Sequence, residues 1–236
     1  ASTTPPTSTP MAGSYLWGPP PTHSIGRHRH PGSLYRMSVD TVSTFLAVGA
    51  LILLACVVAI WVVCLLAVVS SRARRVFDSI RLSVEGQGMW LAWAMAAIAM
   101  AGSLYYSEVA GFPPCEYCWY QRIAMYPLVV ILGIAMVRRD YGIRRYVLPL
   151  ASIGGLISLY HYGVERFPDL QVGECNTLIP CSVAWVWKFD LVSIAFMAFV
   201  CFSVIVTVLL LDRGPTAVST SADDLQPTLE PKDAQP

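Results

Sequence analysis

Long runs of apolar residues, separated by polar stretches, dominate the chain and predict helices that cross a membrane. Each run approaches or exceeds the roughly 20 residues that span a bilayer as a helix. The first run is long for one crossing, so we expect that helix to be tilted. The pattern therefore predicts an all-α, polytopic membrane protein. The expected spans are residues 42–70, 89–106, 119–137, 146–162 and 191–211.

Polar segments flank the predicted spans and connect the first two of them. Residues 1–41 are rich in Pro, Ser and Thr without an apolar period, and residues 212–236 are similarly polar. We interpret both segments as disordered tails. Residues 71–88 form a basic connection in which apolar residues recur at helical spacing. This connection is compatible with a short helix at the membrane interface and equally with a plain loop.

Composition supports the membrane class, and the arginines predict the orientation. Only 13% of the residues are charged, and a soluble domain of this size needs more surface charge. Arginines concentrate in residues 71–88 and 138–145, so these connections should lie on the cytoplasmic side of the cell membrane. The connections 107–118 and 164–190 carry few basic residues and should face outward, which places the C-terminal tail inside and the N-terminal tail outside. The net charge of +1 says little about partners, and we expect no nucleic-acid partner.

Four of the seven cysteines lie in the two outward connections, as the pairs Cys115/Cys118 and Cys175/Cys181. Disulfides persist in the oxidising compartment that these connections face. A disulfide between positions three apart closes a very small loop and stabilises little, so its value is chemical. The second spacing is unusual for zinc, and no histidine lies in either loop, so no metal site is expected. The cysteines inside apolar runs, interpreted as packing residues, are Cys56, Cys64 and Cys201.

The first pair lies where an outward loop becomes a membrane helix. The free N–H groups and partial positive charge of a helix N-terminus favour a thiolate, which is the nucleophilic form of cysteine. Arg122 follows Cys118 by one turn and adds a full positive charge. We therefore interpret Cys115 and Cys118 as a redox pair whose disulfide opens and closes. A membrane scaffold with two structural disulfides is the non-enzymatic alternative.

The run PCEYCWYQRIAMYP at residues 114–127 resembles the signature of the DsbB family of disulfide-forming membrane proteins, and it is closest to the BdbC branch. Residues 179–187, which contain Ile-Pro-Cys, and the Tyr-His pair at 160–161 are also similar to that family. The resemblance covers residues 89–211. It implies a four-helix transmembrane bundle there, so the first predicted helix is an addition at the N-terminal side.

The resemblance implies a protein-dithiol:quinone oxidoreductase. Such a protein oxidises a soluble, thioredoxin-like partner of the DsbA type and passes the electrons to a membrane quinone. By matching positions, Cys118 would be the thiolate that meets the quinone, with Cys115 as its disulfide partner. Arg122 would hold and polarise the quinone, and His161 is a further candidate for the quinone pocket. The type of quinone is left open.

The resemblance also assigns the second pair. Cys175 would be the sulfur that the partner protein attacks, with Cys181 as its resolving mate, and Cys115 and Cys181 would pair transiently between the loops. Only five residues separate Cys175 from Cys181, against a much longer separation in the best-known DsbB proteins. The enzymatic alternative is the vitamin K epoxide reductase-like family, in which the loop cysteines precede the Cys-x-x-Cys pair. Here the order is the reverse.

Overall fold

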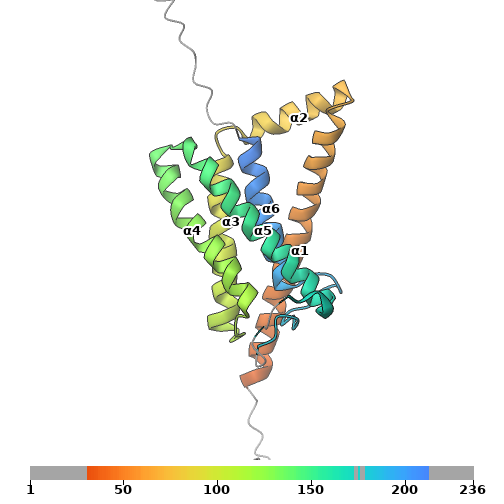
Figure 1. Ribbon diagram of the computed structural model, residues 1–236, viewed down its shortest axis with the longest axis vertical. Coiled ribbons are helices and arrows are strands. Elements are labelled where there is room, and N and C mark those ends of the chain that lie inside the picture. The colour runs from red at the N-terminus through yellow and green to blue at the C-terminus, as the bar shows by residue number, and fades with distance from the viewer. Residues whose placement is uncertain (1–30, 173–174, 176–178, 213–236) are drawn as a thin grey trace, which may run out of the picture.

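The computed structural model describes residues 31–172, 175 and 179–212, and helices make up most of this part of the chain. Five of these helices are long and apolar enough to cross a membrane. This confirms the predicted all-α, polytopic fold. The α-helices are α1 (Pro31–Leu66), α2 (Ser71–Val84), α3 (Gly88–Leu104), α4 (Glu116–Arg138), α5 (Arg144–Arg166) and α6 (Ile194–Leu211) (Figure 1).

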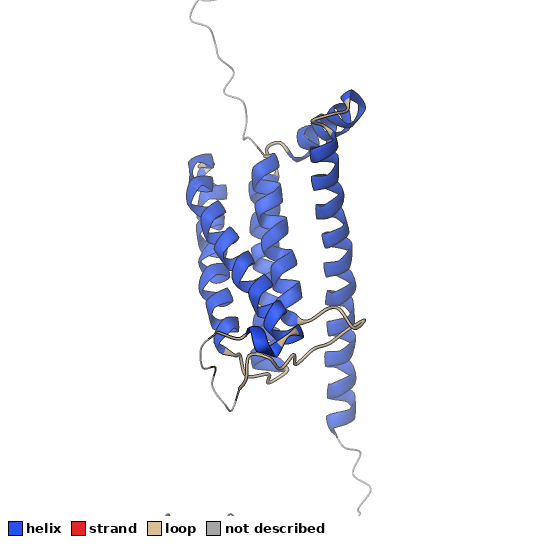
Figure 2. Cartoon of the chain, turned by 45° about the vertical axis from the view of Figure 1, so that its right-hand side comes forward, coloured by secondary structure: helices blue, strands red, loops and turns tan. Residues whose placement is uncertain are grey.

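Helices α3, α4, α5 and α6 pack as a four-helix bundle around an apolar core (Figures 1 and 2). Leu128 and Leu132 of α4 are buried in this core with Phe202 of α6. A Cβ atom on Gly154 of α5 would lie 2.4 Å from the Phe202 ring, so the missing side chain allows α5 and α6 to approach closely. Small residues at such contacts matter in a membrane, where helices associate through close packing rather than the hydrophobic effect.

Helix α1 is the additional helix that the sequence predicts, and it packs against α6 beside the bundle (Figure 2). It begins at Pro31 rather than at residue 42, so residues 31–41, which we expected to be disordered, are helical. Proline is favoured in the first turn because its missing N–H needs no partner there. Polar residues do not stop a helix that has left the membrane, and an apolar pattern therefore marks the membrane boundary better than the helix boundary. Residues 1–30 and 213–236 of the expected tails lie outside the described part.

Most of the basic connection forms helix α2, so it is a helix rather than a plain loop. Helix α2 has no buried residue and lies across one end of the molecule (Figure 1). Its amphipathic, arginine-rich character suits a membrane interface. The arginine-rich turn between α4 and α5 lies at the same end of the bundle, and the two cysteine loops lie at the other end (Figures 1 and 2). The arrangement of the loops therefore agrees with the separation of basic and cysteine-bearing connections in the sequence.

Helix α3 continues into a π-helical turn, η1 (Tyr105–Val109), just before the first cysteine loop. Single π-helical turns inside longer helices occur frequently at functional sites. Tyr106 in this turn is buried, and its hydroxyl group donates a hydrogen bond to Ser43 Oγ of α1 at 3.1 Å. The turn therefore connects the additional helix to the bundle close to the cysteines.

Candidate active site at the two cysteine pairs

The first cysteine pair forms the N-terminus of α4. Cys115 is the N-cap residue, in an extended conformation, and its sulfur accepts a hydrogen bond from the backbone N–H of Cys118 at 3.4 Å. The two Sγ atoms lie 3.0 Å apart, and both thiols are free in this structure. The loop-to-helix junction thus places both sulfurs at the positive end of the helix, as the sequence predicts.

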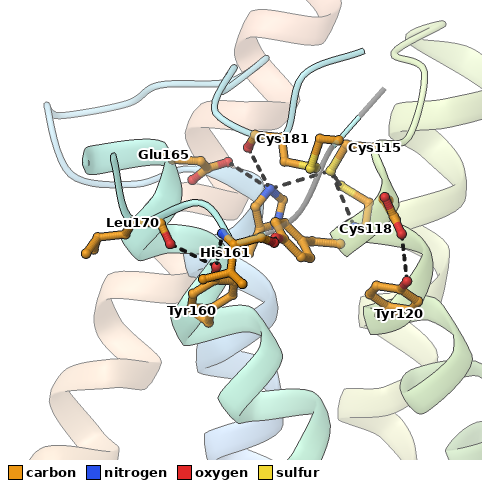
Figure 3. The surroundings of a disulfide bond; sticks show 12 residues. Cys115, Cys118, Tyr120, Tyr160, His161, Glu165, Leu170 and Cys181 are labelled. Carbon is orange, nitrogen blue, oxygen red and sulfur yellow. Dashed lines mark hydrogen bonds and ion pairs between the residues drawn. A yellow bond between two sulfur atoms is a disulfide. The ribbon is translucent and has the colours of Figure 1, made fainter. Parts of the chain in front are cut away.

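The second pair forms a disulfide bond between Cys175 and Cys181, with the Cα atoms 6.1 Å apart. Cys181 is fully buried, whereas Cys175 is half-buried. Cys181 lies beside Cys115, so the second pair meets the first at this end of the bundle (Figure 3). Of the two sulfurs in the second pair, Cys175 is therefore the more accessible one.

His161 of α5 connects the two pairs (Figure 3). Its Nε2 atom lies 3.5 Å from Cys115 Sγ and 3.2 Å from the carbonyl oxygen of Cys181. Its Nδ1 atom lies 3.1 Å from Nε2 of Gln121, a residue of α4. Because the Gln121 amide N–H₂ can only donate, Nδ1 accepts that bond and the ring proton resides on Nε2. The imidazole N–H is thus available to the Cys115 sulfur and the Cys181 carbonyl.

A carboxylate completes the buried polar cluster around His161. Glu165 lies one turn further along α5, and its Oε1 atom is 3.9 Å from His161 Nε2, with both side chains at most 4% exposed. Ser193, at the N-cap of α6, donates a hydrogen bond from its hydroxyl group to Glu165 Oε2. The cluster therefore connects the cysteines to the beginnings of α4 and α6 and to the end of α5.

The surroundings of Cys115 stabilise its thiolate. The largest influence on the pKa of Cys115 is the hydrogen bond from the Cys118 thiol, which lowers it. Burial raises the pKa, and the contact with His161 lowers it further. The resulting pKa is about 4, against an ordinary 9.0. Cys115 is therefore a thiolate at neutral pH when the pair is reduced. The resemblance assigned to Cys118 the thiolate that meets the quinone, and in the reduced pair these hydrogen bonds favour the negative charge on Cys115.

A cavity of about 260 Å³ lies on the other side of Cys118. Arg122 lines it, and the guanidinium Nε and Nη2 atoms donate to the hydroxyl and carbonyl oxygens of Ser103 in α3 at 3.0 and 3.2 Å. The guanidinium also lies over the Trp119 ring, 5.3 Å from its centroid. Cys115 and His161 do not line this cavity. Cys118 therefore separates a polar compartment, which contains His161, from a largely apolar one, which contains Arg122.

The predicted site residues lie in two groups, on either side of Cys118. The structure brings Cys115, Cys118, His161 and Cys181 together, while Arg122 lies on the cavity side and does not contact Cys115. His161 contacts the cysteines instead of the cavity that we expected it to line. The polar residues that support this arrangement were not found from the sequence, although Glu165 lies one helical turn from His161 and this spacing was a signal. These residues are Ser103, Gln121, Glu165 and Ser193.

The sulfurs of Cys115 and Cys118 and a ring nitrogen of His161 all lie within 4.8 Å of one another, close enough to consider a metal ion. Two thiolates bound tetrahedrally to zinc at 2.3 Å would lie about 3.8 Å apart. The observed separation of 3.0 Å is shorter than this. The pair is thus better arranged for thiol–disulfide exchange than for holding a metal.

Two cysteine pairs that meet at one end of a transmembrane helical bundle define a class of membrane proteins with thiol–disulfide chemistry. Residues 86–211 match the model of the family described as disulfide bond formation protein DsbB. The chain therefore belongs to the DsbB family. The matched segment begins after α2, so α1 and α2 lie outside it.

Individual relatives support the same family. Disulfide bond formation protein C of Bacillus subtilis (strain 168) is 44% identical over 127 residues, which cover 53% of this chain and 92% of that protein. A probable disulfide formation protein of Oceanobacillus iheyensis is 47% identical over 117 residues, or 49% of this chain and 81% of the relative. No solved structure matches the chain. Family membership supports an oxidoreductase role in disulfide formation.

Proposed function

We propose that the protein is a protein-dithiol:quinone oxidoreductase that reoxidises an extracytoplasmic, thioredoxin-like partner of the DsbA type and passes two electrons to a membrane quinone. The observation that carries this proposal is the position of Cys118. The Cys118 sulfur lies 3.0 Å from the Cys115 sulfur, and Cys118 also lines the cavity that contains Arg122. Cys118 is thus the point at which electrons from the loops reach a compartment within the membrane bundle.

The cavity has the chemical character that a quinone requires. Arg122 and Gln121 lie beside Cys118 and offer N–H donors to a carbonyl oxygen, and the rest of the lining is mostly apolar. When bound there, the quinone supplies an acceptor for two electrons and two protons. Arg122, whose guanidinium is fixed by Ser103, would hold and polarise the acceptor.

The second pair receives electrons from the partner protein. A thiolate of the partner attacks the half-buried Cys175 sulfur, the Cys175–Cys181 bond breaks, and Cys181 leaves as a thiolate. The Cys181 thiolate attacks Cys115 in the oxidised first pair, and the electron pair of the Cys115–Cys118 bond moves to Cys118. The position of Cys181 beside Cys115 supports this transient bond between the loops (Figure 3).

Two further exchanges complete the transfer. The second thiol of the partner attacks the partner sulfur that is bonded to Cys175 in the mixed disulfide. The partner therefore leaves oxidised, and Cys175 is released as a thiolate. Cys175 then attacks Cys181 in the bond between the loops, which restores the second disulfide and leaves Cys115 and Cys118 reduced. The structure has the second pair bonded and the first pair free, which corresponds to this state before electrons leave.

His161 acts on Cys115 in this scheme. Its Nε2–H stabilises the Cys115 thiolate as that sulfur is released, and the imidazole is placed to exchange protons with it. This role replaces the contribution to the quinone pocket that the resemblance implied for His161. Glu165, whose Oε1 atom is 3.9 Å from Nε2, would stabilise positive charge on the ring.

The proposed orientation places the cysteine loops outside the cell membrane. Both arginine-rich connections, α2 and residues 138–145, lie at the opposite end of the bundle and would face the cytoplasm together with the end of α6 (Figure 1). The partner would then approach Cys175 from the outer side. Membership of the DsbB family favours this function over the vitamin K epoxide reductase-like alternative.

The test is anaerobic reduction of quinone by the purified protein with a reduced thioredoxin-like protein as donor. Wild type should turn over, and Cys118→Ser and Cys175→Ser should each lose turnover. Cys56→Ser, which changes an exposed free thiol of α1, is the matched control and should keep it. If wild type reduces no quinone and both cysteine pairs stay inert to the donor, the cysteines are structural and the proposal is overturned.

A further inference from the structure

The cavity beside Cys118 is formed only in part by the four-helix bundle. Helix α1, which lies before the part of the chain that matches the family, supplies one of its walls. The lining residues of α1 recur along one face over two turns, or about 12 Å at 1.5 Å per residue. They are Phe45, Leu46, Gly49, Ala50 and Leu53. The site that we assign to the quinone is therefore incomplete without the additional helix.

Two glycines line this cavity from different helices, Gly49 of α1 and Gly102 of α3. A Cβ atom built on either residue meets no atom within 4 Å. By contrast, Gly154 in the bundle is required by a close helix contact. Glycine in the middle of a helix is less favourable than alanine, and no helix contact requires it at these two positions. The space that both glycines leave belongs to the cavity.

Polar contacts hold α1 in place on both sides of this wall. Near the cysteine loops, the buried Tyr106 hydroxyl donates to Ser43 Oγ at 3.1 Å. Three turns beyond Gly49, Trp61 Nε1 donates to Thr207 Oγ1 of α6 at 3.1 Å. Polar contacts between helices persist in a membrane because lipid offers no alternative partner. Helix α1 is thus a fixed part of the cavity rather than a loosely attached anchor.

The polar groups of the cavity lie at one end and match an amphiphilic ligand. Cys118, Gln121 and Arg122 surround the end beside the cysteines, whereas Leu53 of α1 and Met95 of α3 line the part nearer the middle of the helices. A polyprenyl quinone has the same distribution, with a polar ring and an apolar tail. Its ring would lie beside Cys118, and the start of its tail would lie along α1.

We propose that α1 is the specificity-determining wall of the quinone site, with Gly49 setting the width available to the quinone ring and the first part of its tail. This inference rests on the proposed quinone oxidoreductase function. It assigns to the additional helix a binding role within the same site. A larger side chain at Gly49 fills the cavity without touching either cysteine pair. It therefore affects quinone binding and leaves thiol–disulfide exchange with the partner unchanged.

The test compares Gly49→Leu with Gly49→Ala and with Ala55→Leu, which adds nearly the same bulk on an exposed face of α1 away from the cavity. The readouts are KM and kcat for short-chain benzoquinone and naphthoquinone, and the rate at which a reduced thioredoxin-like donor forms a mixed disulfide at Cys175. Gly49→Leu should raise the quinone KM about tenfold or more. The increase should be larger for the bicyclic ring, with an unchanged mixed-disulfide rate. Ala55→Leu should match wild type, and Gly49→Ala should lie between the two.

A second variant covers the case in which Gly49→Leu fails to fold. Phe45→Ala removes a ring from the same wall without adding bulk, and it should raise the quinone KM severalfold with the mixed-disulfide rate unchanged. If wild type reduces no quinone, the proposed function itself fails. If wild type turns over but folded Gly49→Leu and Phe45→Ala keep the wild-type KM for both rings, the quinone does not contact α1. The inference about α1 is then overturned while the proposed function stands.

Discussion

The imidazole Nε2 atom of His161 lies 3.5 Å from the Sγ atom of Cys115, and both residues are almost fully buried. Gln121 fixes the ring from the other side through Nδ1, so the N–H on Nε2 is directed at the sulfur. A buried thiolate needs such partners, because burial alone disfavours the charged form. The contact therefore links α5 directly to the charge state of the cysteine at the start of α4.

The reactivity of Cys115 should depend on pH in a way that reveals its lowered pKa. In the reduced protein, hydrogen bonds from Cys118 and His161 hold the pKa of Cys115 at about 4. The thiolate is therefore present above this value and is lost only as the pH falls through it. The rate at which Cys115 is alkylated can be measured by mass spectrometry from pH 3 to pH 9. This rate should be nearly constant above pH 5. A profile that falls between pH 9 and pH 7 would contradict the stabilised thiolate.

Replacing His161 should raise the pKa of Cys115. A hydrogen bond to a charged group contributes about 1.5–3 kcal/mol, so His161→Ala should shift the alkylation profile upward by about one to two pH units. His161→Gln keeps an N–H donor and should shift the profile less. If the profile of His161→Ala coincides with that of wild type, the thiolate depends on Cys118 and the helix N-terminus alone, and His161 has a packing role.

Arg122 should matter for the quinone and not for the partner protein. Its guanidinium lines the cavity and is oriented by Ser103 at 3.0 and 3.2 Å. Removing one oriented donor to a developing negative charge typically lowers the rate by about 10²-fold. Arg122→Met should therefore lower kcat/KM for quinone by about that factor, and Ser103→Ala should lower it less. The rate of mixed-disulfide formation at Cys175 is the internal control, and an equal loss in both rates would indicate misfolding instead.

Gly154 should be intolerant of a side chain for reasons of packing alone. A Cβ atom there would lie 2.4 Å from the Phe202 ring and 2.9 Å from the Ala124 side chain. Gly154→Ala should destabilise the bundle by about 1–3 kcal/mol, as overpacking typically does. Gly163→Ala is the matched control on the same helix, since its nearest new contact is an ordinary 3.8 Å. Thermal unfolding in detergent measures both, and Phe202→Leu should partly rescue Gly154→Ala.

The helices and the position of the first cysteine pair could be predicted because they depend on local signals. Apolar runs locate the spans, and the Pro-Cys-x-x-Cys sequence locates the start of α4. The contact between His161 and Cys115 was not predicted because it depends on how α4 and α5 are rotated in the bundle. In a membrane helix such as α6, apolar residues surround the whole circumference. The hydrophobic pattern therefore does not indicate which face is buried.

The partner of Arg122 illustrates the same limit. Its spacing from Cys118 suggested a charge placed on the cysteine pair, but a side chain one turn along a helix can also point past that pair. In the structure Arg122 reaches Ser103 of α3. The wall that α1 adds to the cavity was equally hidden, because α1 precedes the segment that carries the resemblance and its position depends on tertiary contacts such as Tyr106 with Ser43.

The unequal sharing of protons between Cys115 and Cys118 fixes the proton stoichiometry of the first pair. Reduction of its disulfide adds two electrons, but above pH 4 Cys115 stays ionised and only Cys118 takes up a proton. A couple that binds one proton for two electrons changes its midpoint potential by about 30 mV per pH unit, half of the about 59 mV expected for an ordinary dithiol. The Cys115 sulfur therefore does not take up the second proton of the partner's dithiol, which must leave by another route, and His161 is the titratable group in contact with that sulfur.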